Sequence, residues 1–377
     1  MTTTLTRIEL AGFRSIASMD LQLGRTTVLI GPNGAGKSNL LTFLRMVPRL
    51  RTQSLRTFVG YAGGADALLH HGAKRTPVLR FRIEATDGNG NDTAYAATLG
   101  AAAGDALIFL DERVEARDTR QGPLFTGRSL GAGHVESQLE PSSKNTGLWP
   151  ASAVRAWVMR MNFFHFHDTS TSAPLRNHGN QAESDYLRWD GRNLAPYLYR
   201  LANSDAEADA AAFRRITSLV QRIAPFVKTL EPTLVAPERG DASAVKLDWT
   251  DVNDSRFGVH QLSDGTLRSI ALFTALAQPV ANLPGFIAID EPELGLHPAA
   301  LALFAGLVRS VAPYSQVIVS TQSPALLDEF PPEDVVVVAA PRGASTFQHL
   351  DPNQLAAWLD EYTLSEVWDK NLIGGRP

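Results

Sequence analysis

The feature that most constrains this chain is a glycine-rich octapeptide, Gly31-Pro-Asn-Gly-Ala-Gly-Lys37-Ser38, which fits the pattern G-x-x-x-x-G-K-[ST]. The apolar residues 28–30 before it predict a buried strand, and the apolar spacing of residues 40–44 predicts a helix after it. Glycines let such a loop surround phosphate oxygens with backbone N–H groups, and the helix N-terminus adds a favourable dipole. The sequence therefore predicts a nucleotide-phosphate site between a strand and a helix.

We expect this loop to bind ATP together with Mg²⁺. Lys37 would reach the β- and γ-phosphates and so assist catalysis, and Ser38 would supply a hydroxyl oxygen to the metal ion. The other residues of this segment that we expect to contact the nucleotide are Asn33, Gly34, Ala35, Gly36 and Asn39.

A second apolar run, residues 286–289, ends in two acidic residues, Asp290 and Glu291. A strand buried in a parallel sheet delivers the side chains at its carboxyl end to the ligand crevice. Asp290 is expected to hold Mg²⁺ through water, and Glu291 to orient and deprotonate the attacking water. The alternative is an acidic pair that caps the helix after Pro292, but the phosphate loop upstream favours the catalytic interpretation.

Ser263-Asp264-Gly265-Thr266 opens a long apolar helix. The plainer interpretation is that the serine is an N-cap. The same geometry directs backbone N–H groups outward and also suits a γ-phosphate. Ser263 and Gly265 are therefore candidate nucleotide contacts.

The order of the predicted elements indicates the fold class. Strands are expected at 5–16 and 20–30, and the phosphate loop and its helix follow. Residues 77–115 then predict antiparallel strands, and residues 118–150 predict a loop. A buried strand is expected at 156–167, and helices are expected at 182–229. Apolar strands then alternate with helices up to an amphipathic helical tail at 352–370. This order predicts an α/β nucleotide-binding core that is split by a large insertion.

Composition narrows the function. The chain has no cysteine, which removes disulfides and thiolate zinc sites and fits a cytoplasmic location. The formal net charge is −4, so DNA would have to bind to a local patch. The one dense basic cluster fits either DNA phosphates or a solvated or partner-binding face, and it comprises Arg45, Arg49, Arg51 and Arg56. We expect no membrane span, since no apolar run reaches ~18 residues, and no signal peptide at the start.

Four motifs together resemble a known group of proteins. They are the phosphate loop, Leu-Ser-Asp-Gly-Thr at 262–266, Ile-Asp-Glu-Pro-Glu-Leu-Gly-Leu-His-Pro at 289–298 and Ser-Thr-Gln-Ser-Pro at 320–324. The chain resembles the ATP-binding-cassette (ABC) ATPases of the RecF, SMC and OLD type, and is most similar to the compact bacterial ATPases called AAA-21 proteins. The resemblance implies the α/β fold of a P-loop NTPase of the ABC-ATPase head type.

The resemblance also implies two lobes and a dimer. Residues 1–172 and 283–377 would form the nucleotide-binding lobe with its antiparallel β subdomain, and residues 173–282 a helical lobe carrying the signature motif. Two copies would lie head to tail around two ATP molecules. Ser263 and Gly265 of one copy would then meet the γ-phosphate held by Lys37 of the other.

Phe13-Arg14-Ser15 matches the group's F-[KR]-S element, so the resemblance places Arg14 near the nucleotide phosphates. An ordinary strand-edge arginine is the alternative. The group's Q-loop position, at 164–169, has no glutamine, so His167 or Asp168 is the candidate to complete the Mg²⁺ shell. A transition-metal site at His165 and His167 is a further alternative.

Three other positions depart from the group's pattern. Asp264 replaces the first of the paired signature glycines and would repel a γ-phosphate unless it points away. Gln322 replaces the switch histidine and is the third expected catalytic residue. It can donate a hydrogen bond but exchanges no proton near neutral pH, which favours slow turnover. His297 stands where relatives place an acid that faces the dimer, or it is simply the residue at a helix start.

Two functions fit these observations. The first is an ATPase whose cycle opens and closes a dimer on DNA, in repair, genome maintenance or anti-phage defence. The second is a slow-turnover regulatory ATPase that senses a trigger and controls a separately encoded effector such as a nuclease. We expect any nuclease to be a partner subunit, because the stretch after Gln322 is too short for the Toprim domain of OLD-type relatives. A membrane-transporter subunit fits poorly, because transporters lack the F-[KR]-S element.

Overall fold

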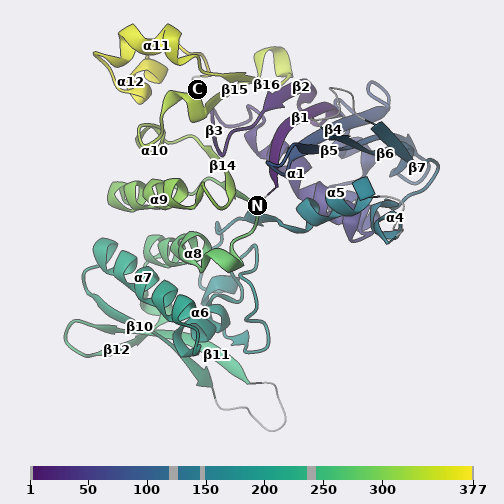
Figure 1. The fold of residues 1–377 in the computed structure, drawn as a ribbon. Coiled ribbons are helices and arrows are strands. Elements are labelled where there is room, and N and C mark those ends of the chain that lie inside the picture. The colour runs from purple at the N-terminus through teal and green to yellow at the C-terminus, as the bar shows by residue number, and fades with distance from the viewer. Residues whose placement is uncertain (1–2, 119–125, 145–148, 236–242, 376–377) are drawn as a thin grey trace. The chain divides into compact units, whose positions relative to one another are not determined.

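The computed structural model describes residues 3–118, 126–144, 149–235 and 243–375. The chain divides into two compact units, Met1–Met161 with Gln316–Pro377 and Asn162–Ser315. Figure 1 shows both units. None of the helices in the described ranges is long and apolar enough to span a membrane.

The first unit contains an antiparallel sheet with the strand order β2-β1-β4-β5-β6-β7 (Figure 1). These strands are β1 (Thr4–Phe13), β2 (Ile16–Gln22), β4 (Val78–Thr86), β5 (Asn91–Ala102), β6 (Ala106–Asp118) and β7 (Thr126–Gly131). Alternate residues of β4 are buried, as expected for a sheet with one packed face. The expected antiparallel strands of 77–115 are thereby confirmed.

A parallel arrangement carries the phosphate loop. Strand β3 (Thr26–Ile30) is wholly buried and lies between β14 (Gln316–Thr321) and β15 (Val335–Ala339), parallel to both. Ile30 is in register with Thr321 and with Val337, so the carboxyl ends of the three strands are level. Strand β16 (Thr346–His349) pairs with β15 in the antiparallel direction.

Helix α1 (Lys37–Arg51) begins directly after the phosphate loop. Its apolar face is buried, which is why the spacing of residues 40–44 predicted a helix. The other helices of the first unit are α2 (Leu55–Tyr61), α3 (Ala65–Leu68), α4 (Leu139–Ser143), α5 (Trp149–Met159), α10 (Pro324–Leu327), α11 (Pro352–Leu359) and α12 (Leu364–Asp369). Helix α5 packs against α1 and against strands β5 and β6.

The second unit is built around helix α8 (Asp264–Ala277), in which every residue from Leu267 to Ala277 is buried. Helices α7 (Glu207–Ile223) and α9 (Pro298–Val311) pack against α8, and α6 (Leu194–Asn203) packs against α7. Strand β13 (Phe286–Asp290) lies next to β8 (Met161–Phe164). A small antiparallel sheet comprises β9 (Gly179–Asn180), β10 (Val227–Val235), β11 (Ala244–Asp251) and β12 (Arg256–Gly258).

Several expected elements are corrected by the structure. Residues 5–16 and 20–30 form three strands, because the chain turns at Arg14 and Ser15 between β1 and β2. The strand expected at 156–167 is the end of helix α5 followed by the short β8. A short apolar run does not by itself distinguish helix from strand. The expected loop of 118–150 contains β7 and α4, and the tail is two helices, α11 and α12.

The boundary between the units differs from that of the predicted lobes. The second unit begins at Asn162 rather than 173 and continues to Ser315 rather than 282, so it includes β13 and α9. It also contains the small β-sheet, which the expectation of a helical lobe did not include. The predicted lobes, 1–172 with 283–377 and 173–282, concern the arrangement around a nucleotide and stay a prediction.

Candidate functional site

The phosphate loop takes its shape from a glycine at the start of helix α1. Gly36 is the N-cap residue and has a φ of 112°, a region that side-chain-bearing residues rarely adopt. A Cβ atom at Gly36 would lie 2.0 Å from the Oγ atom of Ser345. Glycine is therefore required here for both the backbone turn and the close approach of a neighbouring segment.

Lys37 is buried, with 4% of its surface exposed, although it carries a charge. Its Nζ atom donates to the carbonyl oxygens of Gly31 at 2.6 Å and Pro32 at 3.0 Å. Burial of an ammonium group is costly unless hydrogen bonds and an opposite charge compensate for it. These carbonyls hold the positive charge inside the loop, where a phosphate group can approach it.

A chain of hydrogen bonds supports the loop from the F-[KR]-S segment. Asn39 Nδ2 donates to Ser15 Oγ at 2.7 Å, and Ser15 Oγ lies 2.6 Å from Ser345 Oγ. Ser345 Oγ in turn donates to the carbonyl oxygen of Ala35 at 2.6 Å. Ser345 is 310 residues from Ala35 in the sequence, and no local pattern indicated it. It is a supporting residue that the sequence analysis missed.

Arg14 follows β1 and has a φ of 48°, which is uncommon for a residue other than glycine. Its guanidinium group is about half-buried, and burial lowers the pKa of Arg14. Its Nη1 atom lies 3.4 Å from Asn39 Oδ1, at the start of helix α1. Among the described residues, no acidic side chain forms an ion pair with Arg14. A half-buried cation beside a phosphate loop is suited to an anion.

Gln322 follows β14 directly, at the same sheet edge as the phosphate loop. This follows from the pairing of Thr321 with Ile30, the last residues of β14 and β3. Ser323 caps the next helix by accepting a hydrogen bond from the N–H group of Leu326. The carboxyl ends of β3 and β14 therefore carry the loop and the switch glutamine side by side.

In the second unit, the strand β13 ends in the two predicted acidic residues. The Oδ1 atom of Asp290 is buried and accepts no hydrogen bond from any residue of the described ranges. A buried carboxylate oxygen without a donor fits a cation such as Mg²⁺, for which carboxylates are preferred ligands. Glu291 has a φ of 43°. Such a conformation costs ~1–3 kcal/mol and is concentrated at functional sites.

His167 and Asp168, the two candidates for the Q-loop position, have different environments. His167 Nε2 lies 3.0 Å from the carbonyl oxygen of Asp290, so its ring contacts the end of β13. The Asp168 carboxylate is exposed and accepts hydrogen bonds from the hydroxyl and the N–H group of Ser170, which lower its pKa. The rings of His165 and His167 lie 3.8 Å apart. Within the described ranges, however, no group of three metal-binding side chains occurs.

The signature segment forms the start of helix α8. Ser263 is its N-cap, because its Oγ atom accepts from the N–H group of Thr266 at 3.2 Å. This confirms the capping interpretation and leaves the nucleotide contact a prediction. A Cβ atom at Gly265 would lie 2.3 Å from the carbonyl oxygen of Gly295. Gly265 is therefore required for the packing of the signature segment against the loop that follows β13.

The side chain of Asp264 is paired with an arginine. Its carboxylate forms an ion pair with Nη2 of Arg176 at 2.7 Å. Arg176 is buried, with 5% of its surface exposed, and donates further hydrogen bonds to the carbonyl oxygens of Thr169, Val259 and Leu262. From the sequence, the negative charge of Asp264 was expected to repel a phosphate. Arg176 partly compensates this charge.

A second buried arginine joins the signature helix to the Q-loop segment. Arg268 donates to the carbonyl oxygens of Phe166 at 2.8 Å and His167 at 2.7 Å. Its desolvation lowers the pKa of the guanidinium group. Neither Arg176 nor Arg268 was singled out from the sequence, because most of their acceptors, including the Asp264 carboxylate, lie more than 80 residues away in the chain.

The remaining predicted residues have simpler roles in the structure. His297 caps helix α9 by accepting from the N–H group of Ala299 at 3.2 Å, as the plainer interpretation expected. In the basic cluster, Arg51 lies 3.7 Å from Glu140 and is partly neutralised. The other members of the cluster are exposed, and they are Arg45, Arg49 and Arg56.

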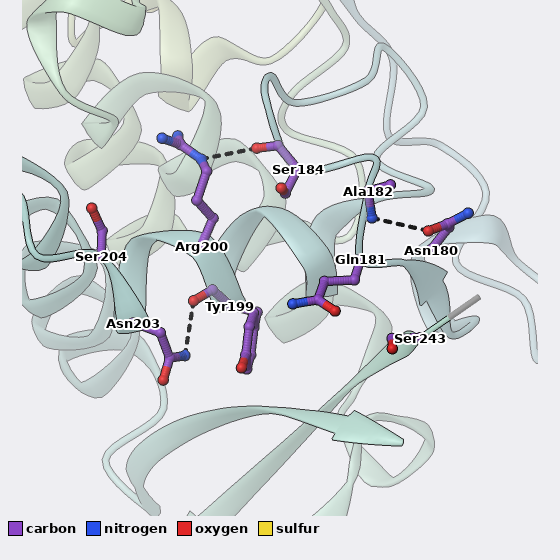
Figure 2. Close-up of a pocket in the computed structure, with 9 residues that line it drawn as sticks. All are labelled: Asn180, Gln181, Ala182, Ser184, Tyr199, Arg200, Asn203, Ser204 and Ser243. Carbon is purple, nitrogen blue, oxygen red and sulfur yellow. Dashed lines mark hydrogen bonds between the residues drawn. The ribbon is translucent and has the colours of Figure 1, made fainter. Parts of the chain in front are cut away.

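Figure 2 shows a polar pocket of about 600 Å³ in the second unit, lined by residues of α6 and of the segment around β9. Tyr199 and Asn203 line it from helix α6, and Gln181 lines it from the facing segment. Arg200 also lines it, but this side chain donates to the Ser184 carbonyl oxygen and pairs with an aspartate of the same unit. None of the predicted site residues lies in this pocket.

Two segments match protein families. Residues 166–328 match the family described as "AAA domain, putative AbiEii toxin, Type IV TA system", and residues 3–58 match "Protein of unknown function (DUF2813)". A stretch of 54 residues is 41% identical to the OLD nuclease of Thermus scotoductus (strain ATCC 700910 / SA-01). That stretch is 14% of this chain and 10% of the nuclease, so the likeness covers a small part of both proteins.

Two solved structures of SMC heads share the fold. One is an SMC head bound to the C-winged helix domain of ScpA, with a TM-score of 0.62, 15% identity, and coverage of 94% of this chain and 99% of that one. The other is the SMC head domain of Pyrococcus furiosus with an extended coiled coil, bound to the C-terminal domain of ScpA. Its TM-score is 0.57 at 15% identity, and the match covers 95% of this chain and 99% of that one. At this identity the likeness concerns the fold, and it confirms the predicted fold class.

Proposed function

We propose that this chain, an ATPase head of the RecF, SMC and OLD type, binds ATP with Mg²⁺ on residues 31–38 and hydrolyses the nucleotide. The observation that carries the proposal is the buried Lys37 ammonium, held by the carbonyl oxygens of the phosphate loop. A charge held in this way is stable only if an anion binds to it or hydrogen bonds compensate it. A triphosphate is the anion that a loop of this sequence fits.

Each residue has a distinct role in the proposed reaction. Lys37 and Arg14 stabilise the negative charge of the phosphates, while the loop's N–H groups orient them. Ser38 and Asp290 would hold the metal ion, which would supply positive charge beside the phosphates. Glu291 orients the attacking water and accepts its proton, a role worth ~10²–10⁴-fold in rate.

The active form in this proposal is a homodimer in the cytoplasm. Ser263 and Gly265 of one copy would approach the γ-phosphate bound by Lys37 of the other, and the N-terminal N–H groups of α8 would add a favourable dipole. Gln322, at the same sheet edge as the loop, would donate a hydrogen bond to the γ-phosphate or to the water. His167, which contacts the end of β13, is a stronger candidate than Asp168 for the Q-loop role.

Replacement of Lys37 tests the proposal. We expect Lys37→Ala to abolish ATP binding in isothermal titration calorimetry and phosphate release in a steady-state assay, because the main charge facing the phosphates is lost. Lys74→Ala is the matched control, since Lys74 is an exposed lysine of the same unit. Unchanged ATP affinity in Lys37→Ala would show that residues 31–38 are not the nucleotide site.

For the cellular role, we propose control of DNA transactions or of a nuclease in defence against phage. The short likeness to an OLD nuclease and the toxin–antitoxin description of the matched family support this direction. The SMC heads of similar fold are bound to ScpA, which supports a protein partner as well. The alternative is a regulatory ATPase with slow turnover, and the replacement of the switch histidine by Gln322 favours it.

DNA binding by the purified chain separates these roles. The measurement is made at ~150 mM salt, where purely electrostatic contacts with phosphates are strongly weakened. Tight binding that requires ATP supports direct action on DNA. Absence of binding, together with an effector that co-purifies from the native operon, supports the regulatory role.

A further inference from the structure

The backbone of Arg14 is in a conformation that needs support. A φ of 48° places this residue in the left-handed region, where the Cβ atom crowds the backbone. Non-glycine residues persist there only when surrounding contacts hold them. Glycine would adopt the same turn at little cost, so the arginine side chain at this position is retained against a conformational penalty.

The support comes from the segment that follows helix α3. The N–H group of Arg14 donates to the carbonyl oxygen of Leu68 at 2.8 Å, and the N–H group of His70 donates to the carbonyl oxygen of Gly12 at 3.0 Å. Phe13 and Leu69 form an isolated β-bridge between these two bonds. The backbone from Gly12 to Arg14 is thus held on both sides of Phe13 by three consecutive residues, from the end of α3 to His70.

Among the residues that the structure describes, His70 makes the one side-chain hydrogen bond to the backbone of Arg14. Its Nδ1 atom lies 2.5 Å from the carbonyl oxygen of Arg14. A carbonyl oxygen can only accept, so Nδ1 carries the hydrogen and donates. This bond fixes the peptide group that follows Arg14 and leads into Ser15, the residue that supports the phosphate loop through Ser345.

The loop that carries His70 is itself anchored away from the phosphate loop. The N–H groups of Ala65 and Asp66 donate to Asp105, to its carbonyl oxygen and its carboxylate respectively. The Asp66 carboxylate accepts from the N–H group of Ala73 at 2.8 Å, which closes the loop behind His70. The backbone of the loop that carries His70 is therefore fixed by its own hydrogen bonds, and the His70 ring contacts Arg14 from this fixed backbone.

We propose that His70 is a positioning residue that holds Arg14 in its left-handed conformation, so that the guanidinium group faces the nucleotide phosphates. The inference rests on the proposed function, since it assumes a nucleotide on residues 31–38. His70 touches no phosphate in this arrangement. It acts through the backbone of Arg14 alone.

The test is ATP affinity measured by calorimetry in a double-mutant cycle. We expect Arg14→Ala to weaken ATP binding by ~10-fold or more, as for loss of a charge-assisted contact, and His70→Ala to weaken it by about fivefold. In the Arg14→Ala background, His70→Ala should cause no further loss, because its effect passes through Arg14. Lys74→Ala is the control, since Lys74 is an exposed residue of the same loop. His71 is unsuitable because its ring packs on that of His70, with the ring centroids 4.1 Å apart.

A conservative pair of variants separates positioning from general support. The Nδ2 atom of asparagine occupies the place of histidine Nδ1, whereas the glutamine amide reaches one carbon further. We expect the ATP affinity of His70→Asn to lie within about twofold of the wild-type value, and that of His70→Gln to lie further below it. This pair also serves if His70→Ala fails to fold, which circular dichroism would show.

The outcomes distinguish the inference from the function on which it rests. Equal losses from His70→Ala in the wild-type and Arg14→Ala backgrounds, or failure of His70→Asn to outperform His70→Gln, overturn the positioning role. If Lys37→Ala instead binds ATP as the wild type does, the proposed function itself is wrong. Loss of ATP binding in Lys37→Ala with wild-type affinity in His70→Ala rejects the inference and leaves the function standing.

Discussion

At the scale of single residues, two of the predicted site residues have a backbone conformation that is uncommon outside glycine. Arg14 and Glu291 are both left-handed, with φ values of 48° and 43°. One follows β1 beside the phosphate loop, and the other follows the buried strand β13. Strain of ~1–3 kcal/mol at such positions is maintained only when the surrounding structure imposes it. Arg14 was selected through the resemblance to a known group, and Glu291 from its place after an apolar run. Six other non-glycine residues of the described ranges are left-handed as well, so this conformation does not by itself mark a functional site.

Gly265 illustrates how a motif residue can have a packing role. We expect Gly265→Ala to lower the melting temperature, because its Cβ atom would lie 2.3 Å from the carbonyl oxygen of Gly295 and the two segments must separate. Overpacking of this kind costs ~1–3 kcal/mol. The measurement is thermal unfolding followed by circular dichroism, without nucleotide.

The matched control for this prediction is Gly306→Ala, in the interior of helix α9. Its Cβ atom would have its nearest neighbour at 4.0 Å, so the change should leave stability equal or raise it by ~0.5–1 kcal/mol. A Gly265→Ala protein that melts at or above the wild-type temperature would contradict the packing role. The glycine would then be explained by access of a phosphate to α8 instead.

At the scale of elements, the start of helix α8 is held by two buried arginines. Arg176 joins the carbonyl oxygens of Val259 and Leu262 to the Asp264 carboxylate. Arg268 joins the same helix to the Q-loop segment through the carbonyl oxygens of Phe166 and His167. His167 also contacts the carbonyl oxygen of Asp290. Three of the predicted motifs in the second unit are thus linked by two arginines outside those motifs and by His167 of the Q-loop segment.

The aspartate in the signature segment is expected to stabilise the fold. We predict that Asp264→Gly, which gives the group's usual Leu-Ser-Gly-Gly, destabilises this protein because Arg176 loses its carboxylate partner while it stays buried. The Asp264 side chain is 65% exposed, so screening by solvent limits the loss to about 1 kcal/mol. Urea unfolding measures the change.

Asp264→Asn should lose less stability than Asp264→Gly, because an amide oxygen can still accept from Arg176. Asp185→Asn is the control on an exposed aspartate of the same unit. If Asp264→Gly is as stable as the wild type, the ion pair has no structural value. The aspartate would then have to be explained by what it contacts in the dimer.

At the scale of the whole molecule, the proposed ATP cycle requires two copies. We expect Glu291→Gln to accumulate as a dimer with ATP and Mg²⁺, because the nucleotide would bind but the water would lack its proton acceptor. Size-exclusion chromatography with light scattering measures the mass with ATP, with ADP and without nucleotide.

The control for dimer formation is the double variant Lys37→Ala with Glu291→Gln, which should stay monomeric under all three conditions. A Glu291→Gln protein with the same mass in ATP, in ADP and without nucleotide would contradict the head-to-tail arrangement. Binding and hydrolysis of ATP within a single copy would then have to be considered separately.

The sequence by itself determined the parts of this protein that depend on contiguous residues. The octapeptide with its strand and helix, the acidic pair after β13 and the N-cap serine of α8 each rely on neighbours within a few positions, so periodicity and motif spacing predict them. The fold class followed from the order of these units. The short strand β8 was merged with the end of α5, because its apolar run is too short to show a period. Strand β10 was missed, because its start overlaps the segment whose spacing predicted a helix.

The tertiary structure decided which distant side chains hold those motifs in place. Ser345 supports the phosphate loop from 310 residues away, and Arg176 reaches Asp264 across 88 residues. The contact between His70 and Arg14 spans 56 residues. Two of these contacts, those of Ser345 and His70, are bonds to backbone carbonyls, which any residue can supply, so no sequence pattern marks them. The third is an ion pair between residues too far apart in the chain for spacing to indicate it. Their partners are set by the packing of strands and helices, which only the folded chain defines.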